Sequence, residues 1–88
     1  MICKRCVVKG RVQGVWYRDT TRRKALELGL VGSAVNMADG SVEVIACGSD
    51  AAVEALCEWL WQGSPMSQVE SVKCEAWAAI ENSDFWIG

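Results

Sequence analysis

Two glycines and an arginine give residues 10–18, Gly-Arg-Val-Gln-Gly-Val-Trp-Tyr-Arg, the character of an anion-binding loop. A strand-like run at residues 6–9 precedes this stretch, and a helix-like run that ends near Leu28 follows it. Glycine allows backbone turns that side chains would obstruct, so that successive N–H groups can point inward and form a nest. The start of the helix adds free N–H donors and a partial positive charge. Together these features predict a pocket for a phosphate-like anion.

Arg18 lies at the far end of this loop and carries a planar, permanently charged fork that suits phosphate oxygens. The alternative is a surface arginine, but a cation at the start of a helix faces the positive end of that helix. An anion bound between them would relieve the repulsion. The two glycines are less specific, because G-x-x-x-G is often only a turn and matches neither the Walker nor the G-x-G-x-x-G pattern.

Asn36 is a second candidate, because it stands in a strand-like run from Leu30 to Met37, where asparagine is disfavoured. Its side chain offers a carbonyl acceptor and an amide donor on one head. The alternative is an ordinary turn residue, since Asp39-Gly40 signals a hairpin turn shortly after it.

The composition narrows the class of protein. The 88 residues suffice for one domain, and with 51% hydrophobic and 23% charged residues we do not expect disorder. The net charge of −2 argues against a nucleic-acid partner, and no apolar run reaches the roughly 20 residues that span a membrane. Because the N-terminus lacks an apolar signal core, we expect a cytoplasmic protein. The absence of histidine removes the commonest general base and metal ligand, so catalysis must use other groups.

The spacing of apolar residues predicts the elements that position these candidates. We expect strands at 2–9, 30–37, 42–47 and 69–77, a short terminal strand at 85–87, and helices from 17 or 18 to 28 and from 49 or 50 to 63. The order β-α-β-β-α-β predicts an α+β, ferredoxin-like sandwich, with two helices on one face of an antiparallel sheet and a short fifth strand. We interpret residues 1–88 as a single domain and residues 78–84 as a mobile loop.

Residues 10–18 as a whole closely resemble the G-R-V-Q-G-V-x-[FY]-R signature of the acylphosphatases. Residues 29–43 are similar to that family's G-x-x-G-x-x-x-N…D-G-x-V-E segment, and the resemblance covers nearly all of the chain. It implies the ferredoxin-like fold and the hydrolysis of acyl phosphates, which are carboxyl-phosphate mixed anhydrides, to carboxylate and inorganic phosphate. This reaction needs neither a cofactor nor a metal, and we expect a monomer acting on a small-molecule substrate.

The resemblance assigns roles to single residues. The loop N–H groups and Arg18 would hold the phosphoryl oxygens, and Asn36 would hold and orient the attacking water. The residues expected to bind phosphate are Gln13, Gly14, Val15, Trp16, Tyr17 and Arg18. We expect Gln13 to contribute mainly its backbone N–H, Tyr17 to pack in the core, and Trp16 to shade the pocket or to pack on the loop.

The chain departs from the family pattern in two places. Ser33-Ala34 replaces a larger aromatic pair that is common in relatives, so we expect looser packing there. Many relatives end in a basic residue where this chain has Ile87-Gly88, so any help from that residue in holding Arg18 is absent or replaced.

Two other functions stay open at this point. Cys3-Lys4-Arg5-Cys6 matches the C-x-x-C string of ferredoxin-like copper carriers, which would indicate a soft-metal-binding module. However, residues three apart on a strand point to opposite faces, so Cys3 and Cys6 could not grip one ion. The other alternative is a non-catalytic phosphate-binding domain, since acylphosphatase-like modules occur within larger proteins. The presence of both Arg18 and Asn36 argues against it.

The five cysteines are expected to be mostly free thiols in a reducing cytosol, and an odd number cannot pair completely within one chain. In the predicted sheet, the first strand runs antiparallel beside the third, which brings Cys3 and Cys47 together. Directly opposed Cα atoms lie about 4.5–5.5 Å apart, within reach of a disulfide, so this pair is predicted to oxidise first in air. We expect Cys6, Cys57 and Cys74 to stay reduced, because core positions suit them better.

Overall fold

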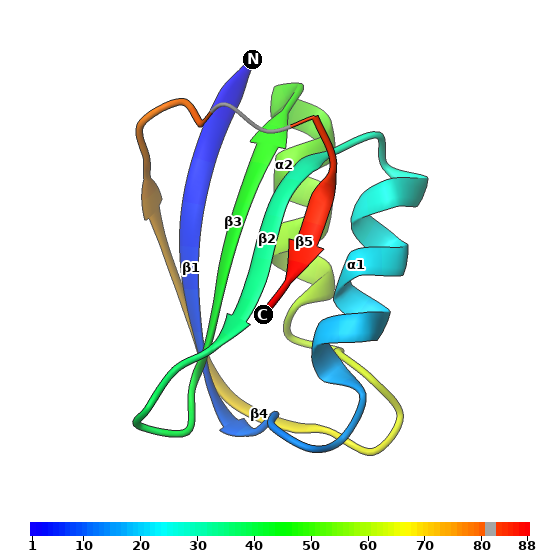
Figure 1. Ribbon diagram of the computed structural model, residues 1–88, viewed down its shortest axis with the longest axis vertical. Coiled ribbons are helices and arrows are strands. Elements are labelled where there is room, and N and C mark those ends of the chain that lie inside the picture. The colour runs from blue at the N-terminus through cyan, green and yellow to red at the C-terminus, as the bar shows by residue number, and fades with distance from the viewer. Residues whose placement is uncertain (81–82) are drawn as a thin grey trace.

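The computed structural model describes residues 1–80 and 83–88 and orders them into strands and helices along the chain (Figure 1). The elements are β1 (Ile2–Arg11), α1 (Tyr17–Glu27), β2 (Val31–Asn36), β3 (Val42–Gly48), α2 (Asp50–Trp59), β4 (Gln68–Ala76) and β5 (Phe85–Ile87). None of the described helices has the length and apolar character needed to cross a membrane.

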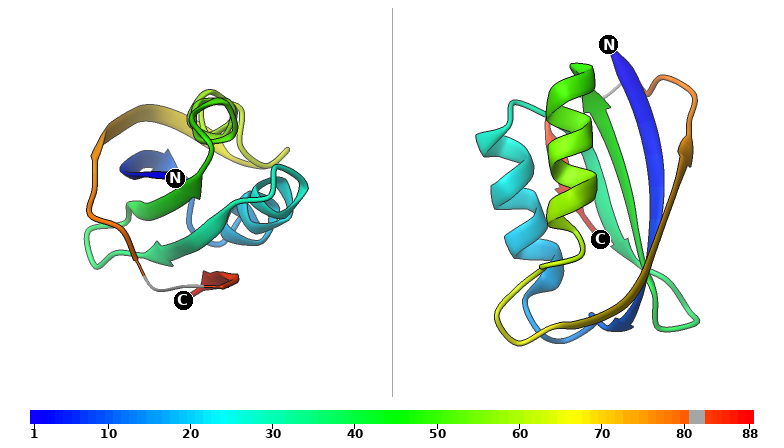
Figure 2. Two further views of the ribbon diagram at one scale, coloured as in Figure 1. Left: turned by 90° about the horizontal axis from the view of Figure 1, so that it is seen from above. Right: turned by 180° about the vertical axis from the view of Figure 1, so that it is seen from behind.

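The strands form one sheet in the order β4-β1-β3-β2-β5, and both helices cover the same face of it (Figure 2). The pairs β1–β3, β1–β4 and β2–β3 are antiparallel. This arrangement confirms the predicted ferredoxin-like α+β sandwich. The short fifth strand pairs in parallel with β2, which makes the sheet mixed rather than wholly antiparallel and places the end of the chain beside β2.

The core lies between the sheet and the helices. Val53 and Leu56 on α2 and Leu60 directly after it are all fully buried, as the apolar spacing predicts. On α1 the buried residues recur every four positions and are Tyr17, Thr21 and Ala25. The alternating strand residues that face them are equally buried and include Val8, Val42, Val44 and Ala46. The helices are therefore held by apolar burial, which stabilises by about 25 cal/mol per Å².

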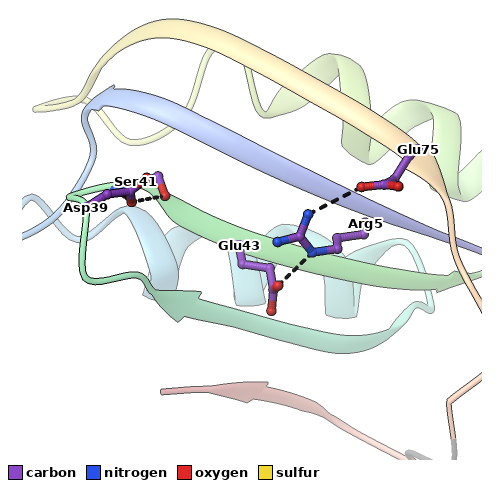
Figure 3. Close-up of polar contacts among 5 residues, drawn as sticks. All are labelled: Arg5, Asp39, Ser41, Glu43 and Glu75. Atoms are coloured by element: carbon purple, nitrogen blue, oxygen red, sulfur yellow. Dashed lines mark hydrogen bonds and ion pairs between the residues drawn. The ribbon is translucent and has the colours of Figure 1, made fainter.

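The other face of the sheet carries no helix and is crossed by polar contacts (Figure 3). The Arg5 side chain on β1 donates to the Glu43 carboxylate on β3 at 2.7 Å and to the Glu75 carboxylate on β4 at 3.3 Å. Arg5 thus bridges both neighbours of its strand, and its guanidinium also lies 5.3 Å from the centre of the Trp77 ring.

Some boundaries differ from those predicted. The first strand continues past Lys9 to Arg11, because a β-bulge between Lys9 and Gly10 keeps it paired with β4. Gly10 has φ 128°, and a Cβ there would collide with the Gln68 carbonyl oxygen, so this glycine serves the sheet rather than opening the loop. The second helix ends at Trp59, earlier than the predicted stop at Gly63.

Of the two residues that could begin α2 by sequence, Ser49 and Asp50, the structure has Ser49 as the N-cap, and its side chain accepts a hydrogen bond from the Ala52 N–H at 3.3 Å. The predicted mobile loop at 78–84 includes residues 81 and 82, which lie outside the described residues. Its mobility stays a prediction.

Tyr17 joins the first turn of α1 to the end of α2. Its side chain is 1% exposed, and its hydroxyl donates to the Leu60 carbonyl oxygen at 2.7 Å. This confirms the expected core position. Burial disfavours the phenolate and raises the pKa of Tyr17 well above its ordinary value of 10.0.

We predict that Tyr17→Phe changes how stability depends on alkaline pH. A folded-state pKa above the unfolded value means that the stabilisation is complete below about pH 10 and is lost as pH rises further. Near neutral pH the variant should be less stable by about 0.5–1.5 kcal/mol, because one buried hydrogen bond is lost. Above about pH 10 the gap should narrow by up to about 1.4 kcal/mol per pH unit. Urea unfolding of both proteins, followed by tryptophan fluorescence, measures this; a constant gap would contradict it.

Candidate functional site

The site is built on the loop at residues 12–16, which connects β1 to α1. Two residues of the loop have left-handed backbones, Gly14 with φ 73° and Trp16 with φ 63°. Trp16 is the N-cap of α1, and its side chain makes no capping hydrogen bond. A bulky residue in this conformation is strained, and such strain persists only where the surrounding structure fixes it. The loop is therefore held in a shape that it would not adopt alone.

Two side-chain hydrogen-bond anchors hold the loop from opposite sides. The Gln13 amide donates to the carbonyl oxygens of Met37 at 2.8 Å and Ser41 at 2.9 Å, which ties the loop to the β2–β3 hairpin. On the other side, the buried Ser64 hydroxyl donates to the Val15 carbonyl oxygen at 2.7 Å. The sequence predicts mainly a backbone role for Gln13 and no role for Ser64, so it reveals neither anchor.

The hairpin that receives Gln13 is itself fixed by a local contact (Figure 3). The Asp39 carboxylate accepts hydrogen bonds from the backbone N–H of Ser41, at 3.0 Å, and from the Ser41 hydroxyl. These bonds favour the charged form and lower the pKa of Asp39. The turn thereby sets the direction of the Ser41 carbonyl that Gln13 uses.

A cavity of about 360 Å³ opens between this loop, α1 and β5. It is lined by Val12, Gly14, Trp16, Tyr17, Arg18, Asp19 and Ile87. Its volume falls within the range of about 300–1,000 Å³ that is typical of small-molecule sites. The Trp16 side chain is 75% exposed, so it borders the cavity at the surface rather than packing on the loop.

The structure brings only part of the predicted phosphate-binding set to the cavity. Gly14, Trp16 and Arg18 line it, as does Tyr17, although the Tyr17 hydroxyl is engaged in the core. Gln13 and Val15 do not line it and instead hold the loop. No local pattern indicates that Ile87 lines the cavity, because its position depends on the parallel pairing of β5 with β2.

Arg18 is the cation of the cavity. It makes no ion pair within residues 1–80 and 83–88, and it is half-buried. The neighbouring Asp19 carboxylate lies 3.5 Å from Arg23, which partly offsets its negative charge. The positive charge of Arg18 thus remains available to an anion in the cavity.

The main-chain oxygen of Gly88 connects the two residues predicted to be catalytic. It accepts a hydrogen bond from Nη1 of Arg18 and another from the backbone N–H of Asn36, at 3.2 Å. Gly88 is held by its own N–H, which donates to the Ala34 carbonyl oxygen at 3.0 Å. A main-chain group at the end of the described chain therefore contacts Arg18.

Asn36 is the last residue of β2, and its side-chain oxygen Oδ1 is buried. No hydrogen-bond partner for this oxygen exists in the described part of the chain. Buried polar atoms are almost always partnered, so an acceptor without a donor marks a place where water or a ligand can bind. Asn36 does not line the cavity. Its backbone N–H is connected to Arg18, which does line it, through the Gly88 oxygen to which both donate.

Two pairs of cysteines face each other across the sheet. Cys3 on β1 and Cys47 on β3 are register partners with Cα atoms 4.1 Å apart, and a disulfide joins them. Cys6 and Cys74 are register partners on β1 and β4, and they also form a disulfide.

The expectation that Cys6 and Cys74 stay reduced is therefore wrong. Cys74 is exposed on the edge strand β4 rather than buried in the core, and the β1–β4 register places it opposite Cys6. Cys57 on α2 keeps a free thiol, as expected.

The chain is similar to known acylphosphatases in both sequence and structure. The profile of the family described as Acylphosphatase matches residues 4–87. An acylphosphatase of Xanthomonas euvesicatoria pv. vesicatoria is 56% identical over 88 residues, which is 100% of both chains. A solved acylphosphatase from Coxiella burnetii has a TM-score of 0.94 at 40% identity, over 99% of this chain and 92% of that one. One from Bacillus subtilis has a TM-score of 0.95 at 34% identity, over 100% and 99%.

We predict that Gln13→Ala loosens the loop. Two hydrogen bonds to the hairpin are lost, which should lower the free energy of unfolding by about 1–2 kcal/mol and speed amide exchange at Gly14 and Trp16. Gln62→Ala is the matched control, because Gln62 is exposed, and it should change stability by less than about 0.5 kcal/mol. Urea unfolding and hydrogen exchange followed by NMR measure both effects. Equal exchange in the two variants would show that Gln13 does not anchor the loop.

Proposed function

The chain belongs to the acylphosphatase family and hydrolyses acyl phosphates, and we propose that Arg18 and Asn36 carry this reaction at the cavity beside residues 12–16. One observation supports this assignment above the others. The Arg18 side chain and the backbone N–H of Asn36 both donate to the main-chain oxygen of Gly88. The side-chain oxygen of the same Asn36 is buried and has no partner among the described residues. This arrangement supports an anion-binding role for Arg18 beside a water-binding role for Asn36.

The phosphoryl group of the substrate takes the place of the anion. The Arg18 fork contacts two of its oxygens, and the backbone N–H groups of residues 13–18 contact the others. These donors are fixed before the substrate arrives, because the loop is already anchored through Gln13 and Ser64. Preorganised donors stabilise charge that shifts in the transition state without a cost of reorganisation.

The attacking water is held by Asn36. A water O–H donates to Oδ1, which has no hydrogen-bond partner within residues 1–80 and 83–88, and the water oxygen is turned toward phosphorus. The P–O bond to the leaving carboxylate breaks as the new P–O bond to water forms. The carboxylate leaves as an anion of low pKa and needs no general acid. The water proton passes to a phosphate oxygen, in keeping with a chain that has no histidine.

The proposal also covers the metal requirement, the oligomeric state and the compartment of the enzyme. We propose a metal-independent monomer that acts in the cytoplasm, with residues 1–88 working as one domain and inorganic phosphate as the product. Arg18, the loop and Asn36 supply positioning and charge, which are the main requirements of phosphoryl transfer. The non-catalytic phosphate-binding alternative gives no role to the Asn36 side-chain oxygen, which has no partner in the part of the chain that the structure describes.

We predict that Arg18→Lys lowers kcat/KM for an aryl acyl phosphate by about 10²-fold or more, because a point charge cannot reproduce the two-pronged contact. Competitive inhibition by inorganic phosphate should weaken in parallel. Arg23→Lys is the matched control on the exposed side of α1 and should keep wild-type rates. The assay is run with excess chelator, which also tests independence from metal ions. Full activity of Arg18→Lys would refute the bidentate role.

Asn36→Ala should separate turnover from binding. We expect kcat to fall by about 10²–10³-fold, the usual effect of losing one preorganised polar group, while the inhibition constant for phosphate stays within about threefold of the wild type. Steady-state kinetics with and without phosphate measure both quantities, and far-UV circular dichroism verifies folding. If phosphate inhibition is lost together with turnover, Asn36 belongs to the anion pocket instead.

A further inference from the structure

Three cysteine sulfurs gather on the helix-bearing face of the sheet, away from the cavity. They are Cys6 on β1, Cys57 on α2 and Cys74 on β4, and their Sγ atoms all lie within 4.8 Å of one another. Cys6 and Cys57 are 3.6 Å apart, in direct contact. None of the three lines the cavity, so the cluster has no part in the hydrolysis described above.

The cluster differs from the Cys3–Cys6 pair that the C-x-x-C string indicated. Cys3 is bonded to Cys47 on β3, whereas Cys6 faces Cys57 of α2. Residues three apart on β1 point to opposite faces of the sheet, so the motif itself cannot close around an ion. The neighbours of Cys6 come instead from distant parts of the chain, which no sequence motif records.

In the structure the Cys6–Cys74 pair is a disulfide and Cys57 is a thiol. A dithiol reductant converts the disulfide into two thiols and is itself oxidised to a disulfide, so atoms and electrons balance. The cytoplasm keeps most protein thiols reduced in this way. Cys74 is exposed on the edge strand, which gives the reductant access to the bond.

We propose that, in the reduced protein, Cys6, Cys57 and Cys74 bind one cuprous ion as three thiolates. A metal–sulfur bond of about 2.3 Å places the corners of a trigonal site about 4.0 Å apart. The Cys6–Cys57 distance of 3.6 Å is already close to that edge. Once the disulfide is reduced, repulsion between Cys6 and Cys74 opens the second edge toward the same value.

The number and type of the ligands, three cysteine sulfurs, determine which metal ion the site favours. Thiolates favour soft ions, and a cuprous ion is satisfied by three of them, whereas structural zinc completes a set of four. The described residues add no fourth cysteine, carboxylate or imidazole to the cluster. Cys6 is 1% exposed, Cys57 is half-buried and Cys74 is exposed, so an ion can enter at β4 and be shielded from water below it.

The charge around the cluster is mixed. The Lys4 ammonium lies near the Cys57 side chain. Lys4 is held in place by the Glu54 carboxylate at 2.8 Å. A bound cation would replace the three thiol protons, and Lys4 would offset part of the remaining negative charge.

The test is a titration of wild-type protein, reduced with a phosphine and kept free of oxygen, with cuprous ion buffered by a chromogenic chelator. We expect the protein to take one equivalent from the chelator. Cys57→Ser should weaken this binding by about 100-fold, the loss of one of three metal–sulfur bonds. Cys3→Ser, whose sulfur lies on the opposite face, should leave it unchanged. Both variants are verified by circular dichroism.

Alkylation of the wild-type protein gives a second readout that needs no variant. Bound cuprous ion should protect Cys6, Cys57 and Cys74 from alkylation and leave Cys3 and Cys47 reactive, as mapped by mass spectrometry. Absence of binding, equal affinity in Cys57→Ser, or protection confined to Cys3 and Cys47 would each overturn the proposal. So would tight binding of zinc without binding of cuprous ion.

Discussion

The left-handed turn of the loop at residues 12–16 is the constraint on which the rest of the site depends. A chain that places Trp16 at φ 63° must be held there from outside. Gln13 and Ser64 do this by bonding the loop to the β2–β3 hairpin and to the segment after α2. Because the loop is fixed before a substrate binds, its N–H groups cost little to organise around a phosphoryl group.

A second constraint joins parts of the chain that are distant in sequence. Arg18 comes from α1 and Asn36 from β2, and both bond to the oxygen of Gly88 at the end of β5. Arg22 makes a second contact between α1 and β5, because its Nε donates to the Phe85 carbonyl oxygen at 2.9 Å. The short parallel strand therefore holds Arg18 and Asn36, the proposed water binder, in fixed positions, which is a larger role than its length indicates.

Local patterns predicted much of the fold. Apolar spacing identified both helices, and the Asp39-Gly40 turn identified the β2–β3 hairpin. The predicted topology also placed Cys3 on β1 opposite Cys47 on β3. What the sequence did not reveal was the register of β1 against β4 and the parallel pairing of β5 with β2. The bulge at Gly10 extends β1, and the β1–β4 register sets Cys6 opposite Cys74, although core burial was expected to keep both reduced. At the site, residues 10–18 marked the loop, but no local signal showed that the Gln13 side chain reaches the hairpin.

The most direct test of the central claim, that residues 13–18 and Arg18 in particular hold the phosphoryl group, is an NMR titration of the folded protein with inorganic phosphate. We expect the backbone amide signals of residues 13–18 and the Arg18 guanidinium signal to shift together with one dissociation constant. Amides around Cys6 and Cys74, on the far part of the sheet, should not move. Shifts confined to other exposed cations such as Arg23 and Lys24, with the loop amides unchanged, would contradict the claim.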